Sequence, residues 1–211
     1  MRALRERFRR TIAATVFSIA ALGAYAALAA DDVIATVTPD ATVTSLHRGL
    51  IALSKEHPGA SIGERYRVLE PLVERTHDLR YIAEFALRKQ WPALSENDRQ
   101  RFIAAFEKLS VMTYASRFKN VSAETFKGSG APTVESGRAH VVTAIKRKDQ
   151  PDVSLDYLLE QRDGAWRIIN IIADGVSDLA LKRAEYQRIL STGSIDDLIK
   201  ELETQTARLQ Q

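Results

Sequence analysis

The chain has 211 residues, no cysteine, 30 basic and 27 acidic side chains. Without cysteine it has no disulfides, thiolate metal ligands or cysteine nucleophile. Residues 1–29 contribute five arginines and Glu6, so the remainder carries 25 basic and 26 acidic side chains, a net charge of −1. That balance leaves no basic field to attract nucleic acid.

The first 29 residues have the pattern of a secretory signal peptide. A basic opening is followed by an uncharged apolar stretch, Ile12 to Leu28, which ends in the small-residue sequence Ala27-Leu28-Ala29. This order is typical of a cleaved signal, and the stretch is only just long enough for the alternative, a permanent membrane anchor. We therefore expect residues 1–29 to be removed and the protein to reside in the periplasm.

A helical part is predicted over residues 43–120, after a flexible lead-in at 30–42 that contains Pro39. Apolar residues recur there at helical spacing. Pro71 lies inside one of these segments, where it favours a kink. Side chains that cap helix starts precede three of them: Ser61 with Glu64, Asp78, and Ser95 with Asp98.

The periodicity changes to that of a sheet over residues 123–174. Asp163-Gly164 is a strong hairpin signal, and short connections in sequence predict a meander. Four strands are expected, at Glu124–Lys127, Ala139–Arg147, Val153–Gln161 and Ala165–Ala173.

Helical spacing returns over residues 177–209, with Ser177 and Ser194 as predicted caps. Gly175 is expected to adopt a positive φ where the last strand turns into the first of these helices. The predicted fold class is α+β: a single domain, residues 43–209, in which helices from both ends of the chain pack against a curved antiparallel four-stranded meander sheet.

Catalytic and metal-binding patterns do not emerge from the polar residues. The four histidines have no ligand spacing, which favours a surface or interface position for a lone histidine. A cavity between a curved sheet and helices could hold acid–base chemistry on Tyr157. Asp156 must point to the other face of that strand, however, so no acid and base converge. We expect no enzyme activity, no metal and no cofactor, and keep a small-molecule isomerase as a minor alternative.

The strongest remaining signal is apolar. Both faces of the strand at 165–173 are apolar around Asn170, so which face is inward stays open, and a solid core is the alternative to a cavity. The residues expected to line an apolar cavity are Ile82, Phe85, Phe102, Phe106, Leu109, Tyr114, Val142, Leu155, Tyr157, Leu159, Ile169, Ile171 and Val176.

Residues 174–190, preceded by Gly164-Ala165-Trp166-Arg167-Ile168-Ile169-Asn170, resemble the MlaC or toluene-tolerance family of periplasmic lipid carriers. Within that family Asp174-Gly175-Val176-Ser177-Asp178 resembles the hopanoid-associated HpnM branch. Phospholipid carriers of the family tend to have leucine where this chain has Asp178, and Tyr-Arg where it has Lys182-Arg183. The likeness spans roughly Leu46 to Leu209.

The resemblance implies a sheet-and-helix fold with a deep apolar cavity for acyl chains and no cofactor. It implies a periplasmic shuttle for a hopanoid or a phospholipid between inner and outer membranes. The implied partners are an inner-membrane transporter, of the RND type or the mammalian-cell-entry type, and possibly an outer-membrane lipoprotein. A non-catalytic scaffold subunit of a membrane transport complex is the alternative function.

Overall fold

A computed structural model describes residues 36–128 and 130–211, which belong to one compact unit. The predicted signal peptide lies outside these residues. Among them, no helix combines the length and the apolar character needed to cross a membrane.

Helix α1 (Pro39–Glu56) begins earlier than expected. Thr38 caps it, accepting a hydrogen bond from the Ala41 amide at 3.3 Å, and Pro39 occupies its first turn. Proline fits that place because its missing N–H is not needed there. Thr42 is buried and donates to the Trp166 carbonyl at 3.1 Å. The expectation that 39–42 form a flexible lead-in is therefore wrong.

Side chains of the predicted type cap the other α-helices. Ser61, Asp78, Ser95, Ser177 and Ser194 each accept a hydrogen bond from an amide in the first helical turn. Helix α2 continues through Pro71 without a break. The elements are α2 (Ile62–Thr76), α3 (Leu79–Ala86), a 3-10 turn η2 (Trp91–Ala93), α4 (Glu96–Arg117), α5 (Asp178–Leu190) and α6 (Ile195–Leu209).

The sheet is antiparallel, as predicted, but has six strands in place of four. The strand order is β1-β3-β4-β5-β6, and β2 also pairs with β3. The strands are β1 (Phe126–Gly128), β2 (Thr133–Glu135), β3 (Arg138–Ile145), β4 (Val153–Arg162), β5 (Ala165–Ala173) and β6 (Val176–Ser177).

Two-residue turns ending in glycine explain the additional strands. Both central residues have positive φ at Ser136-Gly137 (49° and 76°), Asp163-Gly164 (50° and 76°) and Asp174-Gly175 (47° and 81°). Positive φ at both central residues is the requirement of a type I′ turn, whose twist matches that of the two strands it joins. The first and last turns close the hairpins β2–β3 and β5–β6. The sequence had been interpreted at both places as the end of a strand, with no further strand beyond it.

A bulge settles the inward face of β5. The register shifts between Leu158 and Leu159 of β4, so Ile168 lies opposite Leu159 and Ile171 opposite Tyr157. Ile168 and Ile171 therefore share the face of the buried β4 residues, and Ile169 is the extra residue of the bulge. The bulge accounts for the consecutive pair Ile168-Ile169, whereas Ile172 lies opposite Asp156 on the far face of the sheet.

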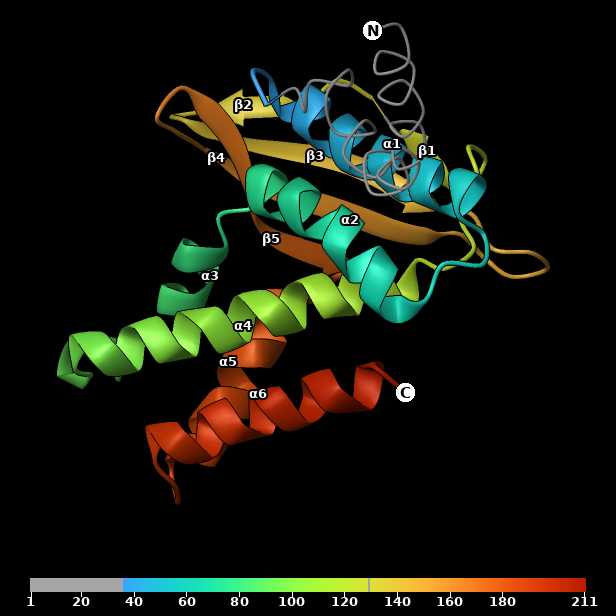
Figure 1. The fold of residues 1–211 in the computed structure, drawn as a ribbon. Helices are drawn as coiled ribbons and strands as arrows, with labels where there is room; N and C mark the ends of the chain where they lie inside the picture. The colour runs from blue at the N-terminus through green and yellow to red at the C-terminus, as the bar shows by residue number, and fades with distance from the viewer. Residues whose placement is uncertain (1–35, 129) are drawn as a thin grey trace, which may run out of the picture. The chain divides into compact units, whose positions relative to one another are not determined.

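The helices lie on one side of the sheet in successive layers, with α1 and α2 nearest to it and α6 beyond α4 (Figure 1). α1 and α2 pack against the sheet, α4 runs along α2 and α3, and α6 packs along α4. The parallel bridge between His77 and Ile168, and the Asp78 amide bonded to the Ile168 carbonyl at 3.0 Å, tie the end of α2 to β5. These two backbone contacts position the start of α3 against β5.

Candidate functional site

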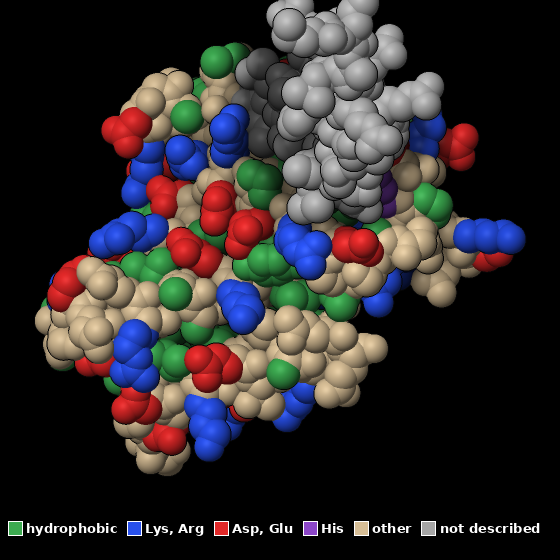
Figure 2. Space-filling view, in the orientation of Figure 1, with side chains coloured by type: hydrophobic (Ala, Val, Ile, Leu, Met, Phe, Trp, Pro, Cys, Tyr) green, Lys and Arg blue, Asp and Glu red, His purple; other side chains and the backbone are tan. Residues whose placement is uncertain are grey.

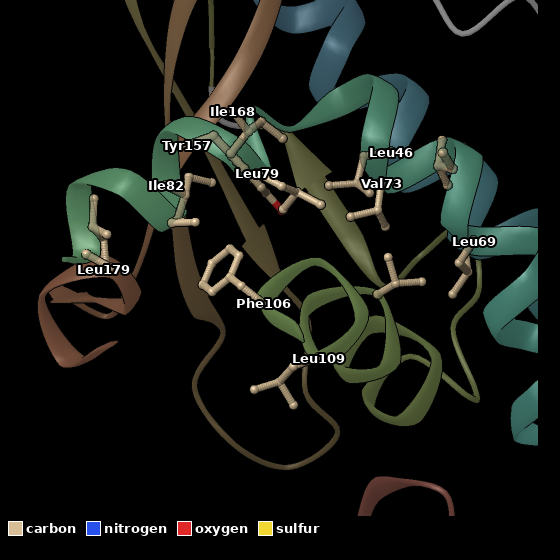
Figure 3. Packing of buried hydrophobic residues seen from close by; sticks show 14 of the residues in the cluster. Leu46, Leu69, Val73, Leu79, Ile82, Phe106, Leu109, Tyr157, Ile168 and Leu179 are labelled. Atoms are coloured by element: carbon tan, nitrogen blue, oxygen red, sulfur yellow. The ribbon is translucent and has the colours of Figure 1, made fainter. Parts of the chain in front are cut away.

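Most of the residues predicted to line a cavity belong to one buried cluster, which extends from the sheet through α3 and α4 to α6. Figure 3 shows side chains of the sheet, α3 and α4 directed into this region, among them Tyr157, Ile82 and Phe106. The predicted residues within the cluster are Ile82, Phe102, Phe106, Leu109, Leu155, Tyr157 and Leu159. We call these seven residues the apolar interior.

The other predicted wall residues occupy different places. Phe85, Tyr114 and Ile171 are partly buried against the cluster, and Ile169 is buried outside it. Val142 lies opposite Asp156 on the far face of the sheet, because neighbouring strand residues alternate between faces. Val176, on β6, is 53% exposed. The structure thus places neither Val142 nor Val176 in the interior.

A buried histidine–tyrosine pair joins α1 to the sheet. His47 Nε2 lies 2.9 Å from the Tyr157 hydroxyl, and the His47 ring stacks on Phe126 at 3.8 Å between centroids. Burial lowers the pKa of His47 to about 4 and raises that of Tyr157. Both groups are therefore neutral at pH 7.

A second pair joins α2 to α4. His77 Nδ1 lies 3.2 Å from the Val73 carbonyl and Nε2 lies 2.8 Å from the Tyr114 hydroxyl. A carbonyl only accepts, so Nδ1 carries the proton and the Tyr114 hydroxyl donates to Nε2. Burial lowers the pKa of His77 to about 4, outweighing the opposing effect of the Val73 carbonyl. These polar pairs were missed from the sequence, which favoured surface positions for lone histidines.

Neither pair supplies an acid–base device. Asp156 is on the opposite sheet face from Tyr157, 3.6 Å from His140. Asp174 is a turn residue, and its carboxylate accepts from the Ser154 amide at 2.8 Å. Within the described part of the chain, no group of three or more His, Asp or Glu could hold a metal ion.

Charged side chains of both signs are scattered over the visible surface (Figure 2), with apolar side chains showing between the helices. No single-sign field covers this face. That pattern agrees with the near-neutral charge of residues 30–211.

A family model described as MlaC protein matches residues 48–204. The chain belongs to the MlaC family. The phospholipid-binding protein from Ralstonia solanacearum, solved in complex with a phospholipid, resembles this MlaC-family chain with a TM-score of 0.71 and 19% identity. The match covers 81% of this chain and 98% of that one. The family and the α+β fold are thus confirmed, whereas membership of the HpnM branch stays a prediction.

Proposed function

We propose that this chain is a phospholipid-binding carrier of the periplasm, and not an enzyme. The observation that carries the proposal is the apolar interior formed by β4, α3 and α4, in a family fold whose Ralstonia relative was solved with a phospholipid. Acyl chains would occupy the space between Leu155 and Tyr157 of β4 and Phe106 of α4.

Carriage, in contrast to catalysis, needs only an apolar environment. Releasing acyl chains into water costs about 0.8 kcal/mol for each CH₂ group. Two long chains would cost on the order of 20 kcal/mol, so a lipid crosses an aqueous compartment very slowly without a carrier. A protein that matches the interior of a bilayer removes that barrier with no reactive side chain.

The route and partners are the finer part of the proposal. The secretory pattern of residues 1–29 supports export, with the mature chain beginning near Ala30, and the absence of cysteine makes it independent of disulfide formation. We propose transfer between an inner-membrane transporter, of the RND or mammalian-cell-entry type, and the outer membrane. Asp178 and Lys182 depart from the family's phospholipid-carrier pattern, so a hopanoid is the second candidate lipid.

Native mass spectrometry of protein purified without detergent tests the proposal directly. Wild type should carry one lipid molecule. Leu155→Glu should lose it and remain folded, because a carboxylate among acyl chains has no partner. Leu158→Glu is the matched control, since Leu158 is the half-buried neighbour on the opposite sheet face. A lipid-free wild type, with the interior filled by its own side chains, would support a scaffold subunit and refute the carrier.

A further inference from the structure

A hollow of about 160 Å³ lies between α3 and the η2 turn that follows it. It is lined by Tyr81, Glu84, Phe85, Arg88, Trp91 and Pro92, and we call it the α3 hollow. Phe85 is partly buried against the core. On the same helix, Ile82 is three residues away and therefore on a neighbouring position of the helix surface. The α3 hollow thus borders the apolar interior.

Two guanidinium groups lie against the Phe85 ring. Arg88, just beyond α3, places its guanidinium carbon 5.5 Å from the ring centroid, and Arg183 of α5 places its own at 5.2 Å. In residues 36–128 and 130–211, no carboxylate lies within ion-pair distance of either arginine, although Glu84 is one helical turn before Arg88. Arg183 Nε is buried with no hydrogen-bond partner.

Two other arginines near α3, Arg162 and Arg99, have polar partners. Arg162 lies 4.2 Å from the Tyr81 ring centroid and pairs with Asp78 and Glu160, each at 3.3 Å. Arg99 donates to the carbonyls of Trp91 and Pro92. The region therefore has structural arginines on its flanks and two at Phe85 whose donors remain available.

Available guanidinium donors beside an apolar surface favour an anionic ligand. A buried charged donor without an acceptor is costly, and the planar guanidinium fork matches phosphate oxygens. Among the lining residues, Glu84 and Arg88 carry opposite charges. Arg183, which lies against the Phe85 ring, adds one positive charge beside the hollow. That charge balances the single negative charge of a phosphodiester.

We propose that the α3 hollow binds the phosphodiester of a phospholipid headgroup through Arg88 and Arg183, while the acyl chains pass Phe85 into the apolar interior. This inference rests on the proposed carrier function and deepens it. It selects phospholipid over a hopanoid that lacks phosphate, because a neutral polycyclic lipid leaves both arginines without an acceptor.

A competition experiment tests the inference. The full chain is incubated with vesicles containing equal amounts of phosphatidylglycerol and of diacylglycerol with the same acyl chains. The lipid bound to the repurified protein is then measured by mass spectrometry. The ratio of the two lipids reports on the headgroup alone, and partial unfolding of a variant lowers both lipids equally.

Wild type should be enriched in phosphatidylglycerol. Arg88→Gln and Arg183→Gln should each lower the ratio by about tenfold, the effect of one charged hydrogen bond, and Arg→Lys at either position should retain part of it. Arg208→Gln, an equal charge change at the exposed end of α6, should match wild type.

The outcomes separate the two proposals. Binding of both lipids with an unchanged ratio in the double variant overturns the headgroup site and leaves the carrier intact. Binding of neither lipid to wild type overturns the carrier. A third outcome is that wild type shows no lipid preference but shifts the ³¹P resonance of added inorganic phosphate, and that the double variant does not shift it. In that case the ligand is free phosphate and the headgroup assignment is wrong.

Discussion

At the scale of single residues, the polar groups within the core are the part that sequence reasoning missed. His47 and Tyr157 are 110 positions apart, and His77 and Tyr114 are 37 apart. A lone histidine carries no spacing signal that identifies such a distant partner, so its burial follows only from the fold. In the fold, each tyrosine hydroxyl satisfies a ring nitrogen that would otherwise be an unpaired polar atom in an apolar layer.

Acid should unfold the protein through these two histidines. Burial holds their folded-state pKa at about 4, below the ordinary histidine value of 6.5, so the unfolded state takes up protons first as pH falls. Stability is then fully present above about pH 6.5 and is lost between there and pH 4. Each histidine contributes on the order of 3 kcal/mol to that loss. Urea melts across this pH range measure it.

His77→Gln should remove about half of this pH dependence. The control is His140→Gln, which also removes an imidazole but at a side chain that is 41% exposed, so it separates the effect of burial from the loss of a histidine as such. An acid slope that is the same in wild type and His77→Gln would show that other groups govern acid unfolding.

At the scale of elements, capping residues and helical periodicity within each segment predicted the helices, whereas the short strands and the bulge depend on pairing with residues elsewhere in the chain. A serine followed three residues later by an aspartate or glutamate predicts a helix start. Ser61, Ser95 and Ser194 each have such a partner and each cap a helix. Strands of two or three residues, such as β2 and β6, have too few positions to show alternation. The bulge at Leu158/Leu159 depends on pairing and is invisible in the strand's own sequence.

The turn between β5 and α5 gives an element-scale prediction. Gly175 has a φ of +81°, and a Cβ there would meet nothing within 4 Å, so Gly175→Val should cost about 1–3 kcal/mol through backbone strain alone. Ser177→Ala should cost about 1 kcal/mol, because it removes the cap bonded to the Ala180 amide at 3.1 Å. Asn170, which accepts from the Leu179 amide, keeps part of that helix start satisfied.

Gly59→Val is the control for strain. A Cβ at Gly59 also meets nothing within 4 Å, but its φ lies outside the left-handed region, so the substitution should be nearly neutral. Equal losses at Gly59 and Gly175 in urea melts would contradict the role assigned to the Gly175 conformation.

At the scale of the whole molecule, the change from helical to strand periodicity and back was enough to predict the fold class. It was not enough to predict the α3 hollow. Arg88 and Arg183 are separated by the entire sheet in sequence, and both lie against the Phe85 ring. Phe85 itself was predicted as a wall residue for its apolar character, without the charges around it. The candidate site thus depends on side chains that only the fold brings together, Phe85 and Arg88 from the α3 region and Arg183 from α5.

The proposed acyl-chain site leads to a prediction about Leu155, which is 7% exposed on the inward face of β4. In a solid core, Leu155→Ala would cost about 2–5 kcal/mol. If the apolar interior is a lipid chamber, the lipid-free protein should lose less, because its wall already faces space that a ligand occupies. Leu198→Ala, at a fully buried position of α6 outside the predicted wall, should show the full core cost. Urea melts of lipid-free wild type and both variants compare these losses. Equal costs at Leu155 and Leu198 would mean that the sheet and helices close on each other without a chamber, and the acyl chains would then need a different place in the fold.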